Sequence, residues 1–339
     1  MRVAVVGAGF YGLHLASVLL KLGLEVVIFE KSSRILNGAS GHNQFRLHLG
    51  FHYPRNFRTR QQSRDGFFKF VDYYGDLTRQ VDDNYYLVPS GDSCIDFPTY
   101  KSIMMSSGID FIETSCPDEI NHPCGCIKTD ERVLLIEKTR EYFQARLCDS
   151  ILLGAEVTVV PKGDRVFVGD GEFDFCIDCT WGHLSHDEKF YFEATLLLYY
   201  QQKPEFKCNK AFTFVDGPLC SLYPTENSRI YTLSSVVHTP LFKSDKPSDA
   251  LRALNNISHV EIQSRKTLME NQLIKYYPNF LDHYEYLSPQ LSLKTKPKGA
   301  DDDRSCYVTS DGRVVRCLSG KIDNIFYAAN EVISILGAI

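Results

Sequence analysis

The side chains best suited to chemistry gather in one loop, residues 31–55, where histidine, asparagine, glutamine, arginine and tyrosine follow one another closely. An arginine can hold a carboxylate through two parallel hydrogen bonds. A histidine titrates near neutral pH, so it can orient or deprotonate an amine or a hydroxyl. The candidate catalytic residues are Arg46, His48, His52 and Tyr53 in this loop, with Arg304 near the other end of the chain.

The elements that must position this loop begin at the N-terminus. The apolar run Arg2–Val6 has the length of a buried parallel strand, and Gly7-Ala-Gly-Phe-Tyr-Gly12 follows it directly. In a GxGxxG turn, Gly7 permits the tight turn, Gly9 lets the backbone approach a pyrophosphate, and Gly12 lets the helix pack closely on the strand. The N-terminus of that helix then offers N–H groups to the phosphates.

The next helix and strand complete a nucleotide-binding unit. Leucines at helical spacing predict a helix over Phe10–Leu22, and Gly23 stands where a left-handed C-cap is expected. The strand Glu25–Glu30 ends in a carboxylate that lies about twenty residues beyond the glycines, where it can accept both ribose hydroxyls of an adenosine. Glu30 would repel a 2′-phosphate, which disfavours NADP. The unit therefore predicts a cofactor that contains ADP.

Bulk properties limit the class of protein. At 339 residues the chain is long enough for two domains. No segment approaches the roughly 18 apolar residues of a transmembrane helix, and the glycines interrupt the apolar N-terminus, so we expect neither a membrane contact nor a secretory signal. The eleven cysteines are then most simply reduced thiols in a cytoplasm. A net charge of −5 gives no general attraction to nucleic acid, although arginines cluster locally between Arg55 and Arg64.

The same loop carries a family resemblance. The stretch Ala39-Ser-Gly-His-Asn-Gln-Phe-Arg-Leu-His-Leu-Gly50 resembles the segment that lies against FAD in the D-amino-acid oxidase-like flavoproteins, which include glycine oxidase, sarcosine oxidase and L-2-hydroxyglutarate dehydrogenase. The resemblance implies an FAD-dependent oxidoreductase. Gln44, Phe45 and Arg46 are bulkier and more polar than the residues usual at these positions, which implies a different substrate pocket.

Later segments follow the order of this family. We predict a helix over Glu131–Cys148, a strand over Ala155–Val160, a hairpin over Arg165–Phe173, a strand over Phe173–Asp178 and a turn over Asp178–Gly182. We also predict a closing strand at Ile325–Ala328 and a closing helix at Asn330–Leu336. In the family these parts contact adenosine and flavin. The glycine turn and the resemblance together imply that the cofactor is bound by Gly7, Gly9, Phe10, Tyr11, Gly12, Glu30, Lys31, Ser40, Asn43, Gln44, Val157, Thr180, Gly182, Ser319, Gly320, Lys321 and Ile322.

The expected fold class is α/β. It comprises a Rossmann-like FAD-binding domain of the GR2 type and a second, α+β substrate domain built on an antiparallel sheet. The FAD-binding domain is expected to be discontinuous, formed by residues 1–56, 130–185 and 300–339, and the substrate domain to comprise residues 57–129 and 186–299. Alternating strands are predicted at Ala194–Gln202, Ala211–Val215, Leu219–Pro224 and Ile230–Val237, and helices at Phe57–Leu77, Phe97–Ser107 and Ser248–Tyr277.

Cysteine patterns bear on metal and on the flavin linkage. Cys116, His122, Cys124 and Cys126 lack the second ligand pair of a structural zinc site, so we expect no metal. The segment beginning at Cys306 resembles the part of sarcosine oxidases in which a cysteine is bonded to the flavin. Most relatives hold FAD noncovalently, which we expect here too, with a thioether to Cys306 as the alternative.

The predicted function is oxidation of the C–N bond of a small-molecule amine or amino acid by hydride transfer to flavin. Oxidation of a 2-hydroxy acid is the nearest alternative. A third possibility is the same oxidation of an amino-acid group carried on a modified nucleobase or a glycan, which only the arginine cluster supports. A non-redox FAD enzyme such as a sugar mutase and a flavin-binding protein without activity are the remaining alternatives.

Overall fold

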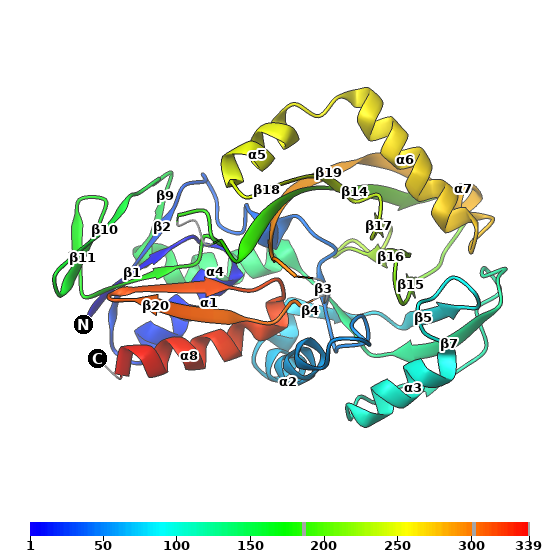
Figure 1. The fold of residues 1–339 in the computed structure, drawn as a ribbon, viewed down its shortest axis with the longest axis horizontal. Helices are drawn as coiled ribbons and strands as arrows, with labels where there is room; N and C mark the ends of the chain where they lie inside the picture. The colour runs from blue at the N-terminus through cyan, green and yellow to red at the C-terminus, as the bar shows by residue number, and fades with distance from the viewer. Residues whose placement is uncertain (185–187, 300–302, 338–339) are drawn as a thin grey trace.

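A six-stranded sheet occupies one side of the computed structural model, which describes residues 1–184, 188–299 and 303–337 (Figure 1). The strand order is β20-β21-β13-β1-β2-β9, and all neighbours are parallel except the β20–β21 hairpin. The strands are β1 (Arg2–Val6), β2 (Glu25–Glu30), β9 (Ile151–Leu153), β13 (Phe175–Asp178), β20 (Tyr307–Asp311) and β21 (Val314–Leu318). This is the parallel sheet that the strand, turn and helix at the N-terminus predict.

Both faces of this sheet are covered, which explains why β1 is apolar throughout. Val3 and Val5 pack against helices, whereas Ala4 and Val6 pack against a small sheet on the other face. The helices on the first face are α1 (Phe10–Lys21), α4 (Ile136–Leu147) and α8 (Ile325–Gly337). The small sheet comprises β10 (Val159–Lys162), β11 (Arg165–Val168) and β12 (Gly171–Phe173).

A larger sheet runs in the order β18-β14-β17-β16-β15-β5-β7-β6, with β19 on the other edge of β14. The 13-residue strand β14 pairs with β19 on one side, and with β18 and then β17 on the other. The bounds are β5 (Asp83–Pro89), β6 (Ile112–Glu113), β7 (Cys124–Thr129), β14 (Phe190–Gln202), β15 (Lys210–Phe214), β16 (Cys220–Pro224), β17 (Ile230–Ser235), β18 (Pro240–Ser244) and β19 (Tyr284–Pro297).

The two faces of the larger sheet differ in chemistry. Leu222 and Leu233 pack with Met269 and Leu273 of the overlying helix α6. The alternate positions of the same strands are mostly hydroxyl-bearing and buried on the opposite face, and they include Thr213, Ser221, Tyr223 and Thr232. Figure 1 shows the covering helices α5 (Pro247–Asn255), α6 (His259–Ile274) and α7 (Phe280–His283) on one side of this sheet.

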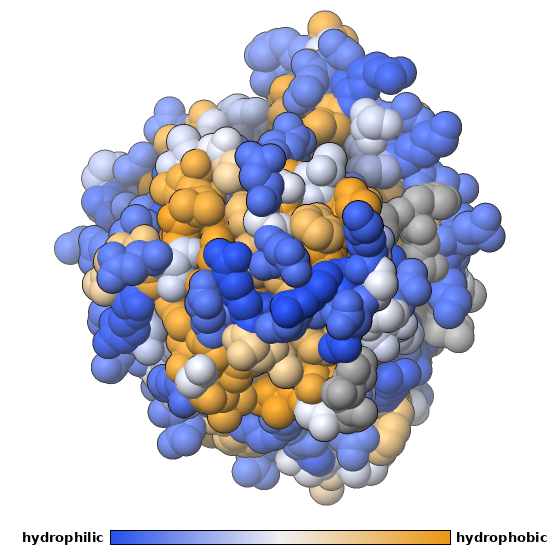
Figure 2. All heavy atoms as spheres, turned by 90° about the vertical axis from the view of Figure 1, so that its left-hand side faces the viewer, coloured by the Kyte–Doolittle hydropathy of each residue, from blue (hydrophilic) through white to orange (hydrophobic). Residues whose placement is uncertain are grey.

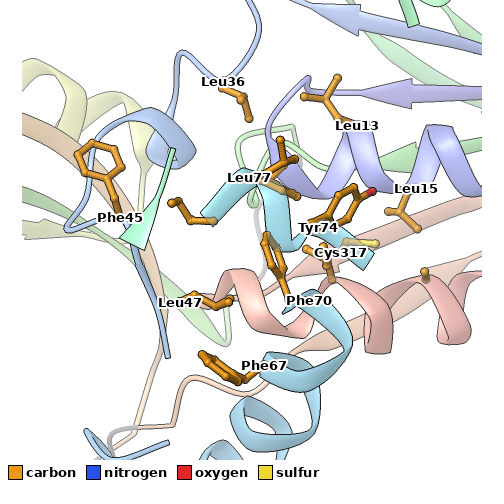
Figure 3. Packing of buried hydrophobic residues seen from close by; sticks show 14 of the residues in the cluster. Leu13, Leu15, Leu36, Phe45, Leu47, Phe67, Phe70, Tyr74, Leu77 and Cys317 are labelled. Atoms are coloured by element: carbon orange, nitrogen blue, oxygen red, sulfur yellow. The ribbon is translucent and has the colours of Figure 1, made fainter. Parts of the chain in front are cut away.

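A third sheet, β3-β8-β4, links the loop at residues 31–55 to the rest of the molecule. Its strands are β3 (Arg46–Leu47), β4 (Thr78–Gln80) and β8 (Arg132–Leu134). Leu47 of β3 lies beside Phe67 and Phe70 of helix α2 (Phe57–Tyr74) in the main core (Figure 3). Helix α3 (Phe97–Ser106) packs against β7. The core therefore fixes the backbone that carries Arg46.

The structure corrects several predicted elements. Residues 132–134 form β8, so the helix predicted from Glu131 begins at Ile136. Only Val159 and Val160 of the strand predicted over Ala155–Val160 lie in a strand, because the preceding residues connect β9 to β10. The helix predicted over Ser248–Tyr277 is two helices, with Ser258 capping the second.

The closing strand is also placed differently. Ile325–Ala328 is the first turn of α8 rather than a strand, and β21 is the last strand of the parallel sheet. The buried residues of α8 include Ile325, Ala329 and Val332, a helical spacing that places one apolar stripe against the core.

The surface is mixed in polarity. Figure 2 views the end of the molecule that carries β10 and β11, where charged and apolar side chains lie side by side. Among the described residues, no helix is long and apolar enough to cross a membrane.

Candidate cofactor and substrate site

The glycine turn leaves open space in front of helix α1. A Cβ on Gly7, whose φ is +101°, would lie 2.9 Å from the Cys179 carbonyl oxygen, and one on Gly12 would lie 2.0 Å from the Gly7 carbonyl oxygen. These contacts make both glycines necessary for packing. A Cβ on Gly9 would meet a single heavy atom of the described residues within 4 Å, the Ser40 Oγ at 3.3 Å. A phosphate can therefore approach the backbone at Gly9.

Glu30 is held at the end of β2 by two backbone donors. Its Oε2 accepts from the Ala8 N–H and its Oε1 accepts from the Ser32 N–H, both at 2.8 Å. Each carboxylate oxygen has a second lone pair for a ribose hydroxyl. The Ala155 N–H donates to the Glu30 carbonyl at 2.9 Å, which brings the segment containing Val157 alongside.

The turn after β13 lies next to the glycine turn. Asp178 Oδ1 accepts from the Thr180 N–H at 2.8 Å and from the Thr180 hydroxyl at 2.6 Å. Gly182 has a φ of +83°, which only glycine adopts easily. The exposed Lys31 lies near His183, and burial and then the Lys31 charge lower the pKa of His183 to about 4. The structure thus brings Thr180 next to Gly7 of the glycine turn, whereas Gly182 lies beside Leu318 and Thr295.

Phe10 and Ser40 interact in a way that limits one prediction. The Phe10 N–H donates to Ser40 Oγ at 3.1 Å, so Ser40 caps α1 from the loop. The Phe10 ring is buried against Phe70 and Phe143. Phe10 can therefore reach a cofactor only through its backbone, and its side chain belongs to the core.

The C-terminal segment closes the other end of the site. The Tyr11 hydroxyl donates to the Lys321 carbonyl at 2.5 Å, and the Lys321 N–H donates to Ser319 Oγ at 3.2 Å. A Cβ on Gly320 would lie 3.3 Å from Arg304 Cδ. Ile322 packs partly buried against the main core. A small hollow is lined by Trp181, Thr295, Arg304, Ser319 and Gly320, among others.

Arg46 has an environment that differs from the predicted one. Its Nη1 donates to the Tyr86 hydroxyl at 3.0 Å and its Nη2 donates to Ser221 Oγ at 2.6 Å. The guanidinium lies 3.9 Å from the centre of the Tyr223 ring and 3.8 Å from Glu131 Oε2. Burial opposes the charged form of Arg46, but Tyr86 and Glu131 outweigh it and raise its pKa. Both terminal nitrogens thus donate hydrogen bonds within the protein, so Arg46 does not offer both of them to a substrate carboxylate.

His48 and His52 lie next to this ion pair. His48 Nδ1 is 3.7 Å from Glu131 Oε1, and the His48 and His52 rings are 5.8 Å apart. Burial, the Lys321 charge and the Arg46 charge lower the pKa of His48 well below its usual range. Burial lowers the pKa of His52 in the same direction. Both rings are therefore neutral at neutral pH.

Lys321 connects the two parts of the site. Its ammonium lies 4.4 Å from the centre of the Tyr53 ring. Burial lowers the pKa of Lys321 and raises the pKa of Asp323, while the attraction between the two charges opposes both changes. His48, His52, Tyr53 and Lys321 thus form one connected group.

Several buried polar atoms of this region have no hydrogen-bond partner among the described residues. They are Arg46 Nε, His48 Nδ1, His52 Nδ1, the Tyr223 hydroxyl and Gln290 Oε1. Buried polar groups are nearly always paired, so these atoms call for a partner such as a ligand or an ordered water. Gln290 itself donates to the Asn43 carbonyl at 3.1 Å and to the Tyr199 hydroxyl, which ties the larger sheet to the loop.

Two remaining loop residues are also placed. Asn43 donates to the Ala39 carbonyl at 2.7 Å, which stabilises the loop itself. Gln44 points toward the larger sheet, where its amide lies 3.4 Å from the Ser221 carbonyl. Gln44 therefore belongs to the side of the substrate sheet.

Sequence reasoning missed Tyr86, Glu131, Ser221, Gln290 and Asp323. Tyr86 and Ser221 sit at alternate positions of strands, a signal that the sequence does contain. Glu131 gave no such signal, because it stands between two elements. His238 lies in the connection between β17 and β18.

This fold and site define an FAD-dependent oxidoreductase, and the chain belongs to that family. The family profile described as FAD dependent oxidoreductase matches residues 2–95. The chain is 48% identical over 338 residues to the FAD-dependent monooxygenase FPY4 of Fusarium mangiferae, which covers 98% of this chain and 90% of that protein. It is 26% identical over 371 residues to the FAD-dependent monooxygenase kojA of Aspergillus flavus, and that alignment covers 100% of this chain and 86% of kojA.

Solved structures show the same fold at low sequence identity. Glycine oxidase from Geobacillus kaustophilus superposes with a TM-score of 0.78 at 11% identity, over 99% of this chain and 95% of that one. The L-α-glycerophosphate oxidase of Mycoplasma pneumoniae gives a TM-score of 0.75 at 12% identity, over 99% and 94%. FAD is the cofactor, and the open space at Gly9 with the Glu30 carboxylate beside it fits the ADP half.

Proposed function

We propose that this enzyme oxidises the C–N bond of a small amine or amino acid, with FAD as the hydride acceptor. The observation that carries the proposal is the pair of half-buried, neutral imidazoles, His48 and His52, each with a buried Nδ1 atom that has no hydrogen-bond partner among the described residues. An amine must lose its proton before its C–H bond can give up a hydride, and a neutral imidazole can accept that proton. FAD supplies the acceptor for the hydride.

Electrostatics support an anionic group on the substrate. The Lys321 and Arg46 charges both act on His48, and the Arg304 charge acts on Lys321. Glu131 and Asp323 compensate only part of this positive charge. Because Arg46 is engaged by Tyr86 and Ser221, we assign the carboxylate of an amino acid to Arg304, which lines the small hollow.

Anaerobic mixing with candidate substrates tests the proposal. Amino acids or amines should bleach the flavin absorbance and release ammonia, whereas 2-hydroxy acids should do neither. His48→Gln and His52→Gln should retain FAD and slow flavin reduction on the order of 10²-fold or more. His238→Gln is the matched control, because that ring lies in the β17–β18 connection. Bleaching by 2-hydroxy acids alone would contradict the proposal.

A second candidate, monooxygenation, is favoured by the 48% identity to a protein named an FAD-dependent monooxygenase. Turnover under ¹⁸O₂ distinguishes the two. Incorporation of one ¹⁸O atom into the organic product would establish monooxygenation. If ¹⁸O appears in hydrogen peroxide and not in the organic product, the enzyme does not insert oxygen, and the proposed oxidation of the C–N bond stands.

The alternative with a macromolecular carrier draws less support from the arginine cluster, because three of its arginines contact other parts of the protein. Arg55 pairs with Asp216, Arg60 donates to the Ser107 hydroxyl, and Arg64 donates to the Ser107 carbonyl. Membership in an oxidoreductase family likewise disfavours a sugar mutase.

We also propose the domain division and the location. The six-stranded sheet draws its strands from residues 1–56, 130–185 and 300–339, and the larger sheet from residues 57–129 and 186–299. This supports a cofactor domain and a substrate domain with those bounds, although helix α2 packs on the cofactor side. All eleven cysteines are unpaired, which supports a reducing, cytoplasmic location.

A further inference from the structure

Three cysteines meet near the outer edge of the larger sheet, away from the cofactor site. Cys124 and Cys126 are two residues apart on β7, so their side chains share one face of the strand. The thiols of both interact with the sulfur of Cys116. Cys126 is buried, whereas Cys116 and Cys124 are half-buried. Two of the three sulfurs are thus within reach of a small solute.

The chain that follows β6 brings Cys116 close to Cys124. Glu113 of β6 lies opposite Ile127 of β7, and the Thr114 N–H donates to the Cys126 carbonyl at 3.1 Å. Cys116 follows two residues later, and its Sγ lies 3.2 Å from the Cys124 carbonyl oxygen. A disulfide needs the two Cβ atoms about 3.5–4.5 Å apart, so a shift of the irregular segment that carries Cys116 would close the bond.

A histidine and an aspartate complete the arrangement. His122 Nδ1 lies 3.9 Å from Cys124 Sγ, and His122 Nε2 lies 3.5 Å from Asp92 Oδ2. Asp92 is itself fixed by the Tyr276 hydroxyl and the Lys275 ammonium. An imidazole nitrogen next to a thiol can accept the proton that the thiol gives up when it attacks, so His122 is placed to assist Cys124.

We propose that Cys116 and Cys124 form a redox-active dithiol that reduces a hydroperoxide and closes to a disulfide. In the first step a thiolate attacks hydrogen peroxide, so that an S–O bond forms, the O–O bond breaks, and water leaves after it takes up a proton. In the second step the other thiol attacks that sulfenic acid, so that the S–S bond forms, the S–O bond breaks, and a second water leaves. Two thiols are oxidised and one peroxide is reduced.

The choice of thiolate follows from the neighbouring sulfurs. The thiols of Cys124 and Cys126 lower the pKa of Cys116, because each can donate a hydrogen bond to its thiolate. Cys116 is therefore the sulfur that attacks the peroxide, and Cys124 is the sulfur that resolves the sulfenic acid. Among the described residues, no group of three or more His, Cys, Asp or Glu side chains is arranged to hold a metal ion, so the thiols are not committed as ligands.

The experiment uses the FAD-loaded full chain in a Cys94→Ser/Cys148→Ser background, which removes the two exposed cysteines. The protein receives one equivalent of hydrogen peroxide together with glutathione as an internal reference thiol. After blocking with N-ethylmaleimide and digestion with trypsin, peptide 102–128 should carry a single label, on Cys126, instead of three. His122→Asn should slow the reaction about tenfold, whereas Cys126→Ser should retain the disulfide.

Two results would overturn the proposal. One is that peptide 102–128 keeps three labels while the reference glutathione is oxidised. The other is that the single label falls on Cys124 or Cys116, because the bond would then involve Cys126. Retention of the flavin spectrum in each variant shows that the fold is intact, so a negative result counts against the dithiol itself.

Discussion

Arg46 Nη1 lies 3.8 Å from Glu131 Oε2, and neither side chain is exposed by more than 1%. Glu131 also accepts from the Leu49 N–H and the Tyr86 hydroxyl, both at 2.8 Å. The pair therefore connects the loop that approaches the cofactor to β5 of the larger sheet. Its first role is to fix the position of that loop, including His48.

Removing one partner of this pair should destabilise the protein more than removing both. Arg46→Met leaves a buried, unpaired Glu131 and should cost about 3–5 kcal/mol of unfolding free energy. The double variant Arg46→Met/Glu131→Gln should recover a large part of that loss, because no buried charge remains. Urea unfolding of the parent protein, Arg46→Met, Glu131→Gln and the double variant measures the coupling free energy between the two side chains. If the two single losses of unfolding free energy simply add up in the double variant, the two charges do not interact.

Gly9→Val should abolish FAD binding while the apoprotein still folds. The side chain would project into the space in front of α1, where few protein atoms lie. Gly38→Ala is the control, because its Cβ would meet no heavy atom of the described residues within 4 Å. Flavin content after gel filtration gives the answer, and a Gly9→Val protein with full flavin content would remove the basis for the assigned site.

Glu30→Ala should weaken FAD binding by two lost hydrogen bonds to the ribose, each worth roughly 1.5–3 kcal/mol. The variant also removes the acceptors of the Ala8 and Ser32 N–H groups, so the turn itself should loosen. Titration of apoprotein with FAD measures the dissociation constant. Glu25→Ala, at the exposed start of the same strand, should bind FAD like the parent protein.

The flavin should be bound noncovalently. Cys306 is buried, and burial raises the pKa of its thiol, which disfavours the thiolate that a thioether would require. Acid precipitation should therefore leave all yellow colour in the supernatant. Colour that stays in the pellet of the parent protein but not in that of Cys306→Ser would establish the covalent bond instead.

His14 should make stability fall in mild acid. Burial lowers its pKa to about 4 in the folded protein, against an ordinary value of 6.5. Between these values the unfolded chain binds more protons, so unfolding becomes easier as the pH falls through this window, by on the order of 3 kcal/mol in total. His14→Phe keeps a ring in this position, and its unfolding free energy should lack this part of the dependence on pH. Melting temperatures of the two proteins from pH 7 to pH 4 test the difference.

The nucleotide-binding unit was predictable because its signals are local. Gly7 and Gly9 stand in the turn between β1 and α1, and Glu30 stands at the end of β2, which are the elements that the sequence predicts. The surroundings of Arg46 were not predictable, because Ser221 and Glu131 reach it from distant segments. The strand predicted at Ile325–Ala328 illustrates a different limit: four apolar residues suit either element, and only the longer spacing to Val332 reveals a helix.

The sheet order β21-β13-β1 places residues 314–318 two strands away from residues 2–6. During synthesis, the sheet that contains β1 is therefore incomplete until residues 314–318 have been made. Contacts between such distant segments form slowly, because a long loop must close first. Ser319 and Lys321 follow β21 at once, so the part of the candidate site that they form is assembled last. FAD should therefore be captured only once residues 314–321 have folded onto the sheet, and its supply, through the binding energy it adds to the folded state, should govern how much enzyme accumulates.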